Sequence, residues 1–268
     1  MILNIRTYLD YEIAAPSDIL LQFEVAARAD QRILSAHIDV RTPEHFTRVA
    51  AEDGIGERIW IRAEGRLTCT YSATIEIDRP VIDIGQLAQL PTHLLPGEMV
   101  KYLMASRYCE ADDFQHFVTN EFGALTGGAR IAAIRDWIES NFKYVSGASN
   151  SRTTASDSFI QRQGICRDFA HVMITLARAS AIPARMASVY APGIDPPDFH
   201  AVAEVFLEDA WRLIDATGMA SADNMAVIGV GRDAADIAFL TSYGDVTLRE
   251  ISVSALEPAK DVDNNTNK

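Results

Sequence analysis

The sequence has few cysteines, a shortage of positive charge and no long apolar run. Its three cysteines, Cys69, Cys109 and Cys166, are widely spaced among 268 residues, so neither a disulfide framework nor a paired C-x-x-C zinc site is predicted. The 24 Lys and Arg residues against 37 Asp and Glu give a net charge of −13, which argues against a nucleic-acid-binding protein with its basic footprint. No apolar run is long enough to predict a membrane span.

The N-terminal residues also lack the features of a targeting segment. Met1 to Thr7 contain neither a basic stretch nor a long apolar stretch, so we expect no secretory signal. Unpaired cysteines then favour a reducing, cytoplasmic location. With 48% hydrophobic and 23% charged residues, the chain has the composition of a soluble globular protein. Its length suits two modest domains.

The first part of the chain has the patterns of β structure. From Leu67 to Ile77, apolar and polar residues alternate, which predicts a strand with one buried face. Leu21 to Val25 and Ile59 to Ala63 repeat the pattern, and glycines such as Gly65 supply turn positions between strands. Cys69 lies on the apolar side of its strand, so we assign it to packing. We predict an antiparallel β-sandwich of several short strands.

A segment rich in proline and glycine, Pro80 to Gly97, predicts a seam between two domains. Asp112-Asp113 can cap a first helix that Gly123 ends. A second helix after Thr126-Gly127-Gly128 places Ile131, Ile134, Ile138 and Phe142 on one face. Ser146 to Asp157 is polar and predicts a loop, the kind of segment that often carries a functional group.

The chain is organised around the stretch from Gln163 to His171. From Cys166 onward, apolar residues recur at steps of three and four, which predicts a helix with one buried face. Ile182-Pro183 ends it. Cys166 then lies in the first turn, where unpaired backbone N–H groups and the helix dipole favour an anion. We expect a partly ionised, reactive thiol there, although an arbitrary buried cysteine more often serves as a small hydrophobic residue.

Strand patterns follow Pro183. We predict strands at Ala184–Ala191, Phe199–Leu207 and Trp211–Asp215, with a tight turn at Glu208-Asp209. Gly229-Val230-Gly231 predicts a loop. Val246 to Val253 predicts a closing strand, and the polar residues 260–268 predict a disordered tail.

Cys166, His200 and Asp215 are the candidate catalytic residues. A cysteine nucleophile needs an imidazole that shares its proton and a carboxylate that orients the imidazole. His200 is expected near the start of one strand and Asp215 at the end of the next. In an antiparallel pair, those two positions are neighbours across the ladder. A helix N-terminus packed at that edge would add Cys166.

The same residues also allow other interpretations. His200 can be structural, and Asp215 can be a turn residue. His200 and Glu204 are four residues apart, a spacing that suits two metal ligands on a helix. However, this segment has a strand pattern, and no second histidine falls nearby to complete a zinc site. His171 is expected on another face of the Cys166 helix, in a structural or hydrogen-bonding role.

The residues around this constellation resemble the transglutaminase-like superfamily of papain-related cysteine enzymes. Within it, they are similar to bacterial two-domain proteins with a β-rich N-terminal domain. The resemblance covers roughly residues 107 to 240 and rests on several motifs in the family's chain order. These motifs are Arg107-Tyr108-Cys109-Glu110, Asp136-Trp137-Ile138, Gly164-Ile165-Cys166-Arg167-Asp168-Phe169-Ala170-His171, Ala181-Ile182-Pro183-Ala184-Arg185, Asp198-Phe199-His200-Ala201 with Glu204-Val205, and Trp211-Arg212-Leu213-Ile214-Asp215-Ala216-Thr217.

The resemblance implies that Cys166 is the nucleophile, His200 the acid/base and Asp215 the orienting carboxylate. Two departures bear on activity: Arg167 stands where cross-linking transglutaminases usually have Trp, and Val202 replaces an aromatic residue. Aromatic walls help exclude water from an acyl-enzyme, so their replacement weakens the inference of cross-linking. The third departure, Ala216 within the family's Asp-Pro-Thr, concerns a turn.

We therefore predict an α+β protein in which an antiparallel β-sandwich (1–95) precedes a transglutaminase-like domain (96–260) and a tail (261–268). The expected activity is hydrolysis of a peptide or protein amide through a thioester. Tyr144, Gln161 and Gln163 are the candidate second oxyanion donors. The alternatives are acyl transfer to an amine, a non-catalytic binding protein and a metal-dependent hydrolase. We expect no cofactor, no metal and, without a calcium-loop pattern, no calcium requirement.

Overall fold

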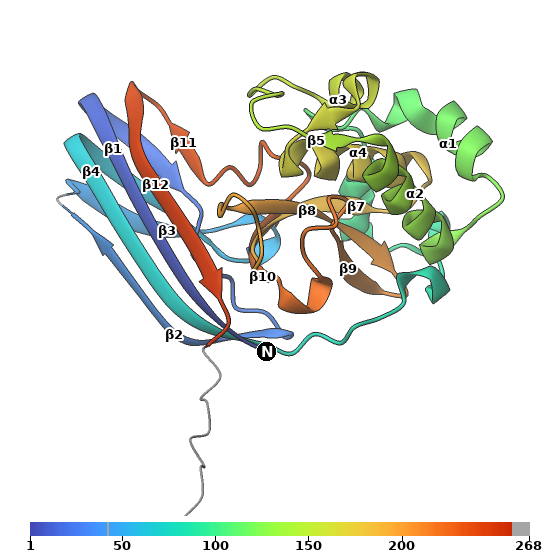
Figure 1. Ribbon diagram of the computed structural model, residues 1–268, viewed down its shortest axis with the longest axis horizontal. Coiled ribbons are helices and arrows are strands. Elements are labelled where there is room, and N and C mark those ends of the chain that lie inside the picture. Colours follow the sequence, from blue (N-terminus) through green and yellow to red (C-terminus); the bar gives the residue numbers. More distant parts are fainter. Residues whose placement is uncertain (42, 259–268) are drawn as a thin grey trace, which may run out of the picture.

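The computed structural model describes residues 1–41 and 43–258, so the predicted tail, 261–268, lies outside the described residues. A large antiparallel sheet packs against a second part made of four α-helices and a smaller sheet (Figure 1). The large sheet has six strands. They are β1 (Ile2–Leu21), β2 (Gln31–Val40), β3 (His45–Ala50), β4 (Glu57–Ile77), β11 (Leu240–Ser242) and β12 (Val246–Leu256).

The large sheet is antiparallel, as predicted, but its strands are long. β1 and β4 pair along nearly their whole length, and the predicted strands at Ile59–Ala63 and Leu67–Ile77 are one strand. Gly65, predicted as a turn, lies inside β4 with φ +74°, next to a register shift of β1 between Ile13 and Ser17. A glycine in this conformation forms a bulge that bends a strand without ending it.

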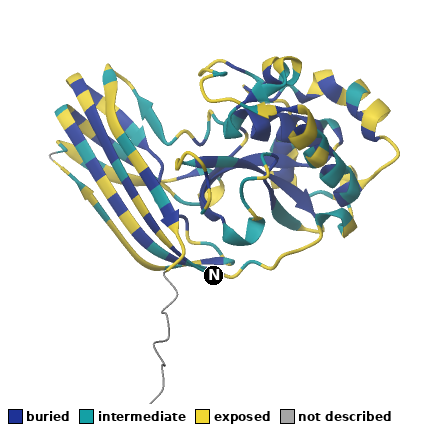
Figure 2. Ribbon diagram, viewed as in Figure 1, coloured by how far each residue is buried: buried dark blue, intermediate teal, exposed yellow. Residues whose placement is uncertain are grey.

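The second layer against this sheet comes from the other half of the chain. Buried and exposed residues alternate along β1 and β4 (Figure 2). The buried face shares one hydrophobic cluster with Tyr190, Ala226 and Ile228. Ala226 and Ile228 belong to β10 (Ala226–Gly231), a strand where we predicted a loop at Gly229-Val230-Gly231. That prediction was wrong because Gly229 serves close packing: a Cβ there would lie 2.0 Å from the Gln22 Nε2 atom.

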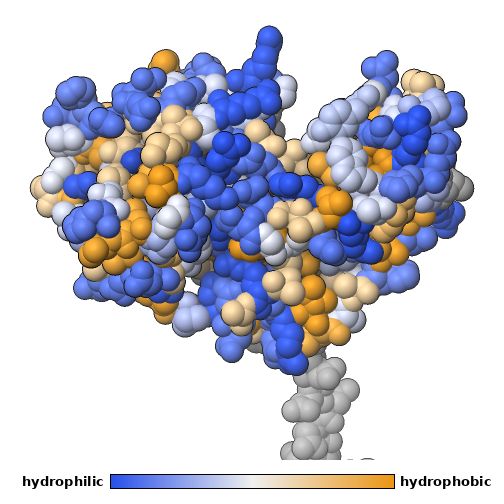
Figure 3. Space-filling view, turned by 180° about the vertical axis from the view of Figure 1, so that it is seen from behind, coloured by the Kyte–Doolittle hydropathy of each residue, from blue (hydrophilic) through white to orange (hydrophobic). Residues whose placement is uncertain are grey.

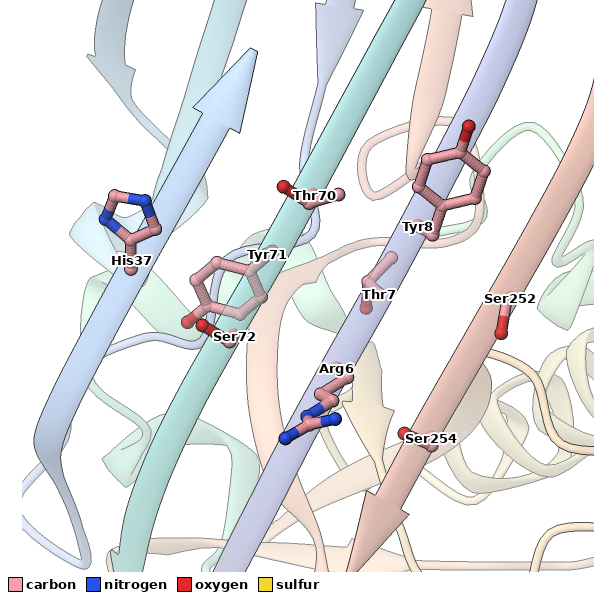
Figure 4. Close-up of a pocket in the computed structure, with 9 residues that line it drawn as sticks. All are labelled: Arg6, Thr7, Tyr8, His37, Thr70, Tyr71, Ser72, Ser252 and Ser254. Carbon is pink, nitrogen blue, oxygen red and sulfur yellow. The ribbon is translucent and has the colours of Figure 1, made fainter.

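The outer face of the sheet is polar. Side chains of four strands form rows across it, with Arg6 of β1 opposite Ser72 of β4 and Ser254 of β12, and His37 of β2 opposite Ser72 (Figure 4). A shallow hollow of about 360 Å³ lies over these rows. The polar residues of the alternating pattern that predicted these strands therefore lie on the outer face.

The closing strand predicted at Val246–Val253 exists as β12, but it belongs to the large sheet. It pairs with β1, so that Thr7 lies opposite Val253. β11 pairs with β1 as well. The predicted domain 96–260 contained both strands. The difference arises because β1 offers a long free edge on the side away from β4, and the apolar residues Val253 and Ala255 continue the buried face there.

The helices of the second part are α1 (Gln115–Phe122), α2 (Gly127–Asn141), α3 (Ala155–Gln161) and α4 (Cys166–Ala179). The helix predicted from Cys166 is confirmed. Asp112 and Asp113 do not cap α1, because they lie in a separate 3₁₀ turn (Ala111–Phe114). α3 begins inside the predicted loop Ser146–Asp157, where Thr154 and Asp157 form a reciprocal cap.

The smaller sheet carries two of the predicted site residues. Its strand order is β10-β7-β8-β9, with β7 (Ala184–Tyr190), β8 (His200–Leu207) and β9 (Ala210–Ile214). These three strands were predicted within one residue at each end. α4 packs across β7 and β8. A short parallel pair, β5 (Lys143–Tyr144) with β6 (Gln163–Gly164), leads into α4. No helix of the described residues is long and apolar enough to cross a membrane.

Candidate active site

Cys166 is the first residue of α4, and the turn before it is fixed by Asp168. The Ile165 backbone N–H donates to Asp168 Oδ2 at 2.8 Å, and the Asp168 side chain is fully buried. Gly164 allows this arrangement, since a Cβ there would lie 2.7 Å from Asp168 Oδ2. Cys166 is partly exposed and lies at the N-terminus of α4, where the helix dipole favours negative charge.

The other two cysteines are packing residues, as predicted for Cys69. Cys69 and Cys109 are buried, and burial raises the pKa of each thiol to about 12. A protonated, inaccessible thiol is a poor nucleophile. Cys166 is therefore the cysteine of this chain that a reagent or substrate can reach.

His200 and Asp215 form a buried pair in the smaller sheet. His200 begins β8, Asp215 follows the last residue of β9, and the two strands are antiparallel neighbours. The His200 Nε2 and Asp215 Oδ2 atoms are 2.9 Å apart. Burial lowers the pKa of His200, but the interactions with Asp215 and then with Cys166 outweigh it and raise the pKa to about 9. The imidazole is therefore protonated at neutral pH.

The structure also places Cys166 beside this pair. Since Nε2 of His200 faces Asp215, the ring nitrogen left for the thiol is Nδ1. This atom is buried and has no formed hydrogen bond within the described residues, while the Cys166 side chain is near enough to raise the His200 pKa. Such a near contact is common in a resting site and shortens when substrate is bound.

Asp215 is held by groups to which the sequence alone assigned no role. Its Oδ1 accepts hydrogen bonds from the Thr217 N–H at 2.8 Å and from Thr217 Oγ1 at 2.7 Å. Its Oδ2 accepts one from the Ala220 N–H at 2.9 Å. Burial raises the pKa of Asp215, but the interaction with His200 and then the hydrogen bonds from Thr217 lower it overall. The Asp-x-Thr spacing of an Asx turn is the local signal for the Thr217 contact.

Of the three candidate oxyanion donors, Tyr144 is the one placed at Cys166. The β5–β6 pair fixes it, with the Val145 N–H donating to Gly164 O at 2.9 Å. Burial and then the nearby Cys166 raise the pKa of Tyr144 to about 12. Gln161 is exposed at the end of α3 and Gln163 is part of β6.

The contacts of Glu204 and His171 give both residues structural roles. Glu204 is fully buried and accepts hydrogen bonds from Arg28 Nη1 and Arg185 Nε, both at 2.8 Å. Its oxygens are therefore engaged by two guanidinium groups rather than presented with His200 to a metal. His171 is buried, accepts the Ala234 N–H at 3.2 Å and stacks on Tyr108, which is the structural role predicted for it.

The molecular surface, seen from the back, is notched between the large sheet and the helical part (Figure 3). The loop between β5 and α3 projects beside this notch (Figure 1). That loop follows Tyr144 directly along the chain. The rim of the notch thus includes a segment connected to the candidate oxyanion donor.

Comparison with known proteins places this chain in a family. The family model of the transglutaminase-like superfamily matches residues 116–216, which include Cys166, His200 and Asp215. A solved structure of a candidate cysteine protease from Cytophaga hutchinsonii is 32% identical, with a TM-score of 0.92 over 97% of this chain and 92% of that chain.

Two curated relatives match a shorter region. An uncharacterised protein of Mycobacterium leprae is 29% identical over 118 residues, which are 41% of this chain and 42% of the relative. An uncharacterised protein of Mycobacterium tuberculosis is 30% identical over 115 residues, 37% of each chain. The chain therefore spans less than half of the length of these relatives. The family model and the full-length structural match lead to one assignment: the chain belongs to the transglutaminase-like superfamily.

Proposed function

We propose that the protein is a cysteine-dependent amide hydrolase that acts through a thioester on a peptide or protein substrate. The observation that carries the proposal is the buried His200–Asp215 pair, 2.9 Å apart, next to the one cysteine that is accessible. The raised pKa of His200 favours an imidazolium that can stabilise a neighbouring thiolate. We also propose a cytoplasmic location, in keeping with a free reactive thiol.

In the acylation step, the Cys166 thiolate attacks the amide carbonyl carbon and a carbon–sulfur bond forms. The oxyanion accepts hydrogen bonds from the Cys166 backbone N–H and from the Tyr144 hydroxyl. The His200 imidazolium then donates its proton to the leaving nitrogen as the carbon–nitrogen bond breaks, leaving a thioester and a neutral imidazole. Asp215 stabilises the imidazolium and keeps its ring oriented.

In the deacylation step, neutral His200 takes a proton from water, which attacks the thioester. The carboxylic acid leaves, and the thiolate–imidazolium pair is restored. A primary amine in place of water would give acyl transfer by the same steps. We favour water, because Arg167 and Val202 stand where cross-linking members of the family carry aromatic residues that exclude it.

A turnover screen tests the proposal. The wild type is incubated with casein, glutamine-containing peptides and small amides, with and without a primary amine. We expect release of carboxylic acid products and no activity in Cys166→Ala, while Cys69→Ala, which lacks a buried packing cysteine, keeps it. Amine incorporation in preference to hydrolysis would favour acyl transfer. No turnover by the wild type together with an unreactive Cys166 would favour a non-catalytic binding protein.

A further inference from the structure

The polar loop after Tyr144 is attached to the nucleophile helix at more points than a connecting segment needs. We define this loop, residues 145–154, as the strap; it joins β5 to α3. Most of its residues are small and polar, and most are at least partly exposed. It is therefore held in place by side chains of other segments rather than by a hydrophobic core of its own.

Arg167, the residue directly after Cys166, makes the first attachment. Its Nη2 atom donates to the Asn150 carbonyl at 2.8 Å and lies 3.2 Å from Ser149 Oγ. The same nitrogen is 3.1 Å from Asp168 Oδ1. Asp168 in turn fixes the turn before Cys166. One guanidinium therefore joins the strap to the carboxylate that positions the nucleophile.

Tyr108 makes the second attachment. Its hydroxyl donates to the Ser151 carbonyl at 2.8 Å, and its carbonyl accepts the Ala155 N–H at 2.8 Å. The Tyr108 ring stacks on His171 of α4, with ring centroids 5.1 Å apart. His171 is itself fixed by the Ala234 N–H. The strap is thus fastened to α4 at Ser149, Asn150 and Ser151, through two residues, Arg167 and Tyr108, that take no part in the proposed reaction itself.

We propose that the strap is the specificity-determining wall of the acyl site, and that Arg167 and Tyr108 are the positioning residues that hold it there. The inference rests on the proposed reaction at Cys166. The strap begins next to Tyr144, which lies at the nucleophile, and its middle is tied to the residue that follows the nucleophile. A wall of small polar residues held beside Cys166 admits extended acyl groups and resists bulky ones.

The test compares alkylation of Cys166 by a small reagent, iodoacetamide, and a bulky one, pyrenyl maleimide, using intact mass spectrometry. We expect Arg167→Ala to raise the ratio of the rate constant for the bulky reagent to that for the small reagent about fivefold. This factor corresponds to the net free energy of about one hydrogen bond. Tyr108→Phe, which keeps the stacked ring, should raise it less. Arg167→Lys should be intermediate, because an ammonium cannot reproduce the fork of contacts. Arg152→Ala, an exposed arginine of the same strap, is the matched control.

Hydrogen–deuterium exchange gives the second measurement. If the strap is positioned as proposed, exchange in residues 145–154 rises in Arg167→Ala and Tyr108→Phe but not in Arg152→Ala. The proposal is overturned if the ratio of bulky to small rate constants in Arg167→Ala and Tyr108→Phe equals that in Arg152→Ala. It is also overturned if exchange rises as much throughout α4 as in residues 145–154. If Arg167→Ala does not fold, the same two measurements on Tyr108→Phe test the proposal. If Cys166 of the wild type reacts slowly with both reagents but the variants still raise the ratio of rate constants as expected, the proposed hydrolase is contradicted and the proposed role of the strap is supported.

Discussion

Removing the charge of Asp215 should change how the stability of the protein depends on pH. The pKa of His200 is raised from 6.5 to about 9, and a tenfold change in proton affinity is worth about 1.4 kcal/mol. The imidazolium therefore contributes up to about 3 kcal/mol to the free energy of unfolding. Because the folded-state pKa is raised, this contribution is fully present below about pH 6.5 and is lost as the pH rises toward about 9.

Asp215→Asn keeps the size of the side chain and removes the charge that contributes most to the raised pKa. We expect urea unfolding of the wild type to lose up to about 3 kcal/mol between about pH 6 and about pH 9.5, and the variant to lose less than half of that. Asp10→Asn is the control, because Asp10 is buried but its carboxylate pairs with Arg66 instead of a histidine. Equal pH dependence in the wild type and Asp215→Asn would refute the reasoning.

Three further changes test other parts of the structure. Glu204→Gln removes the buried carboxylate shared by Arg28 and Arg185, which keep only the partly exposed Asp30 and Asp53, and should lower the free energy of unfolding by about 3 kcal/mol. Glu76→Gln, in an exposed pair with Arg32, should cost under about 1 kcal/mol; similar losses in urea unfolding would contradict this. Gly164→Ala places a Cβ against Asp168 and should slow alkylation of Cys166, unlike Gly97→Ala, where a Cβ has open space. Tyr144→Phe should lower kcat for amide hydrolysis about 10²–10³-fold without changing the iodoacetamide rate; unchanged kcat would remove Tyr144 from the oxyanion site.

The sequence predicts the elements of the site well because they depend on local patterns. The apolar spacing after Cys166 specifies α4, and the alternation in Ala184–Asp215 specifies three strands and the turn between the last two. Once these strands are antiparallel, their register, with Ala203 opposite Ile214, brings Asp215 to the end of the sheet where His200 begins β8. The helix, the strands and the pairing are all confirmed.

The parts that could not be predicted depend on contacts far apart in the chain. Nothing local to Val246–Val253 says that the strand joins β1 rather than the smaller sheet. Gly65 and Gly229 look like turn residues, because a glycine that bends a strand and one that admits a neighbouring side chain have the same sequence signal. The contacts of Arg167 with Ser149 and Asn150 are invisible for the same reason, since they require the fold of the strap.

The rate at which Cys166 reacts with iodoacetamide, measured from about pH 5 to about pH 8 in the wild type and in His200→Ala, tests the central claim most directly. A thiolate held by the His200 imidazolium predicts that the wild-type thiol reacts faster than a free cysteine at the acidic end of this range, and that His200→Ala abolishes the advantage. A wild-type thiol no faster than free cysteine at any pH, or a His200→Ala thiol as fast as the wild type, would contradict it.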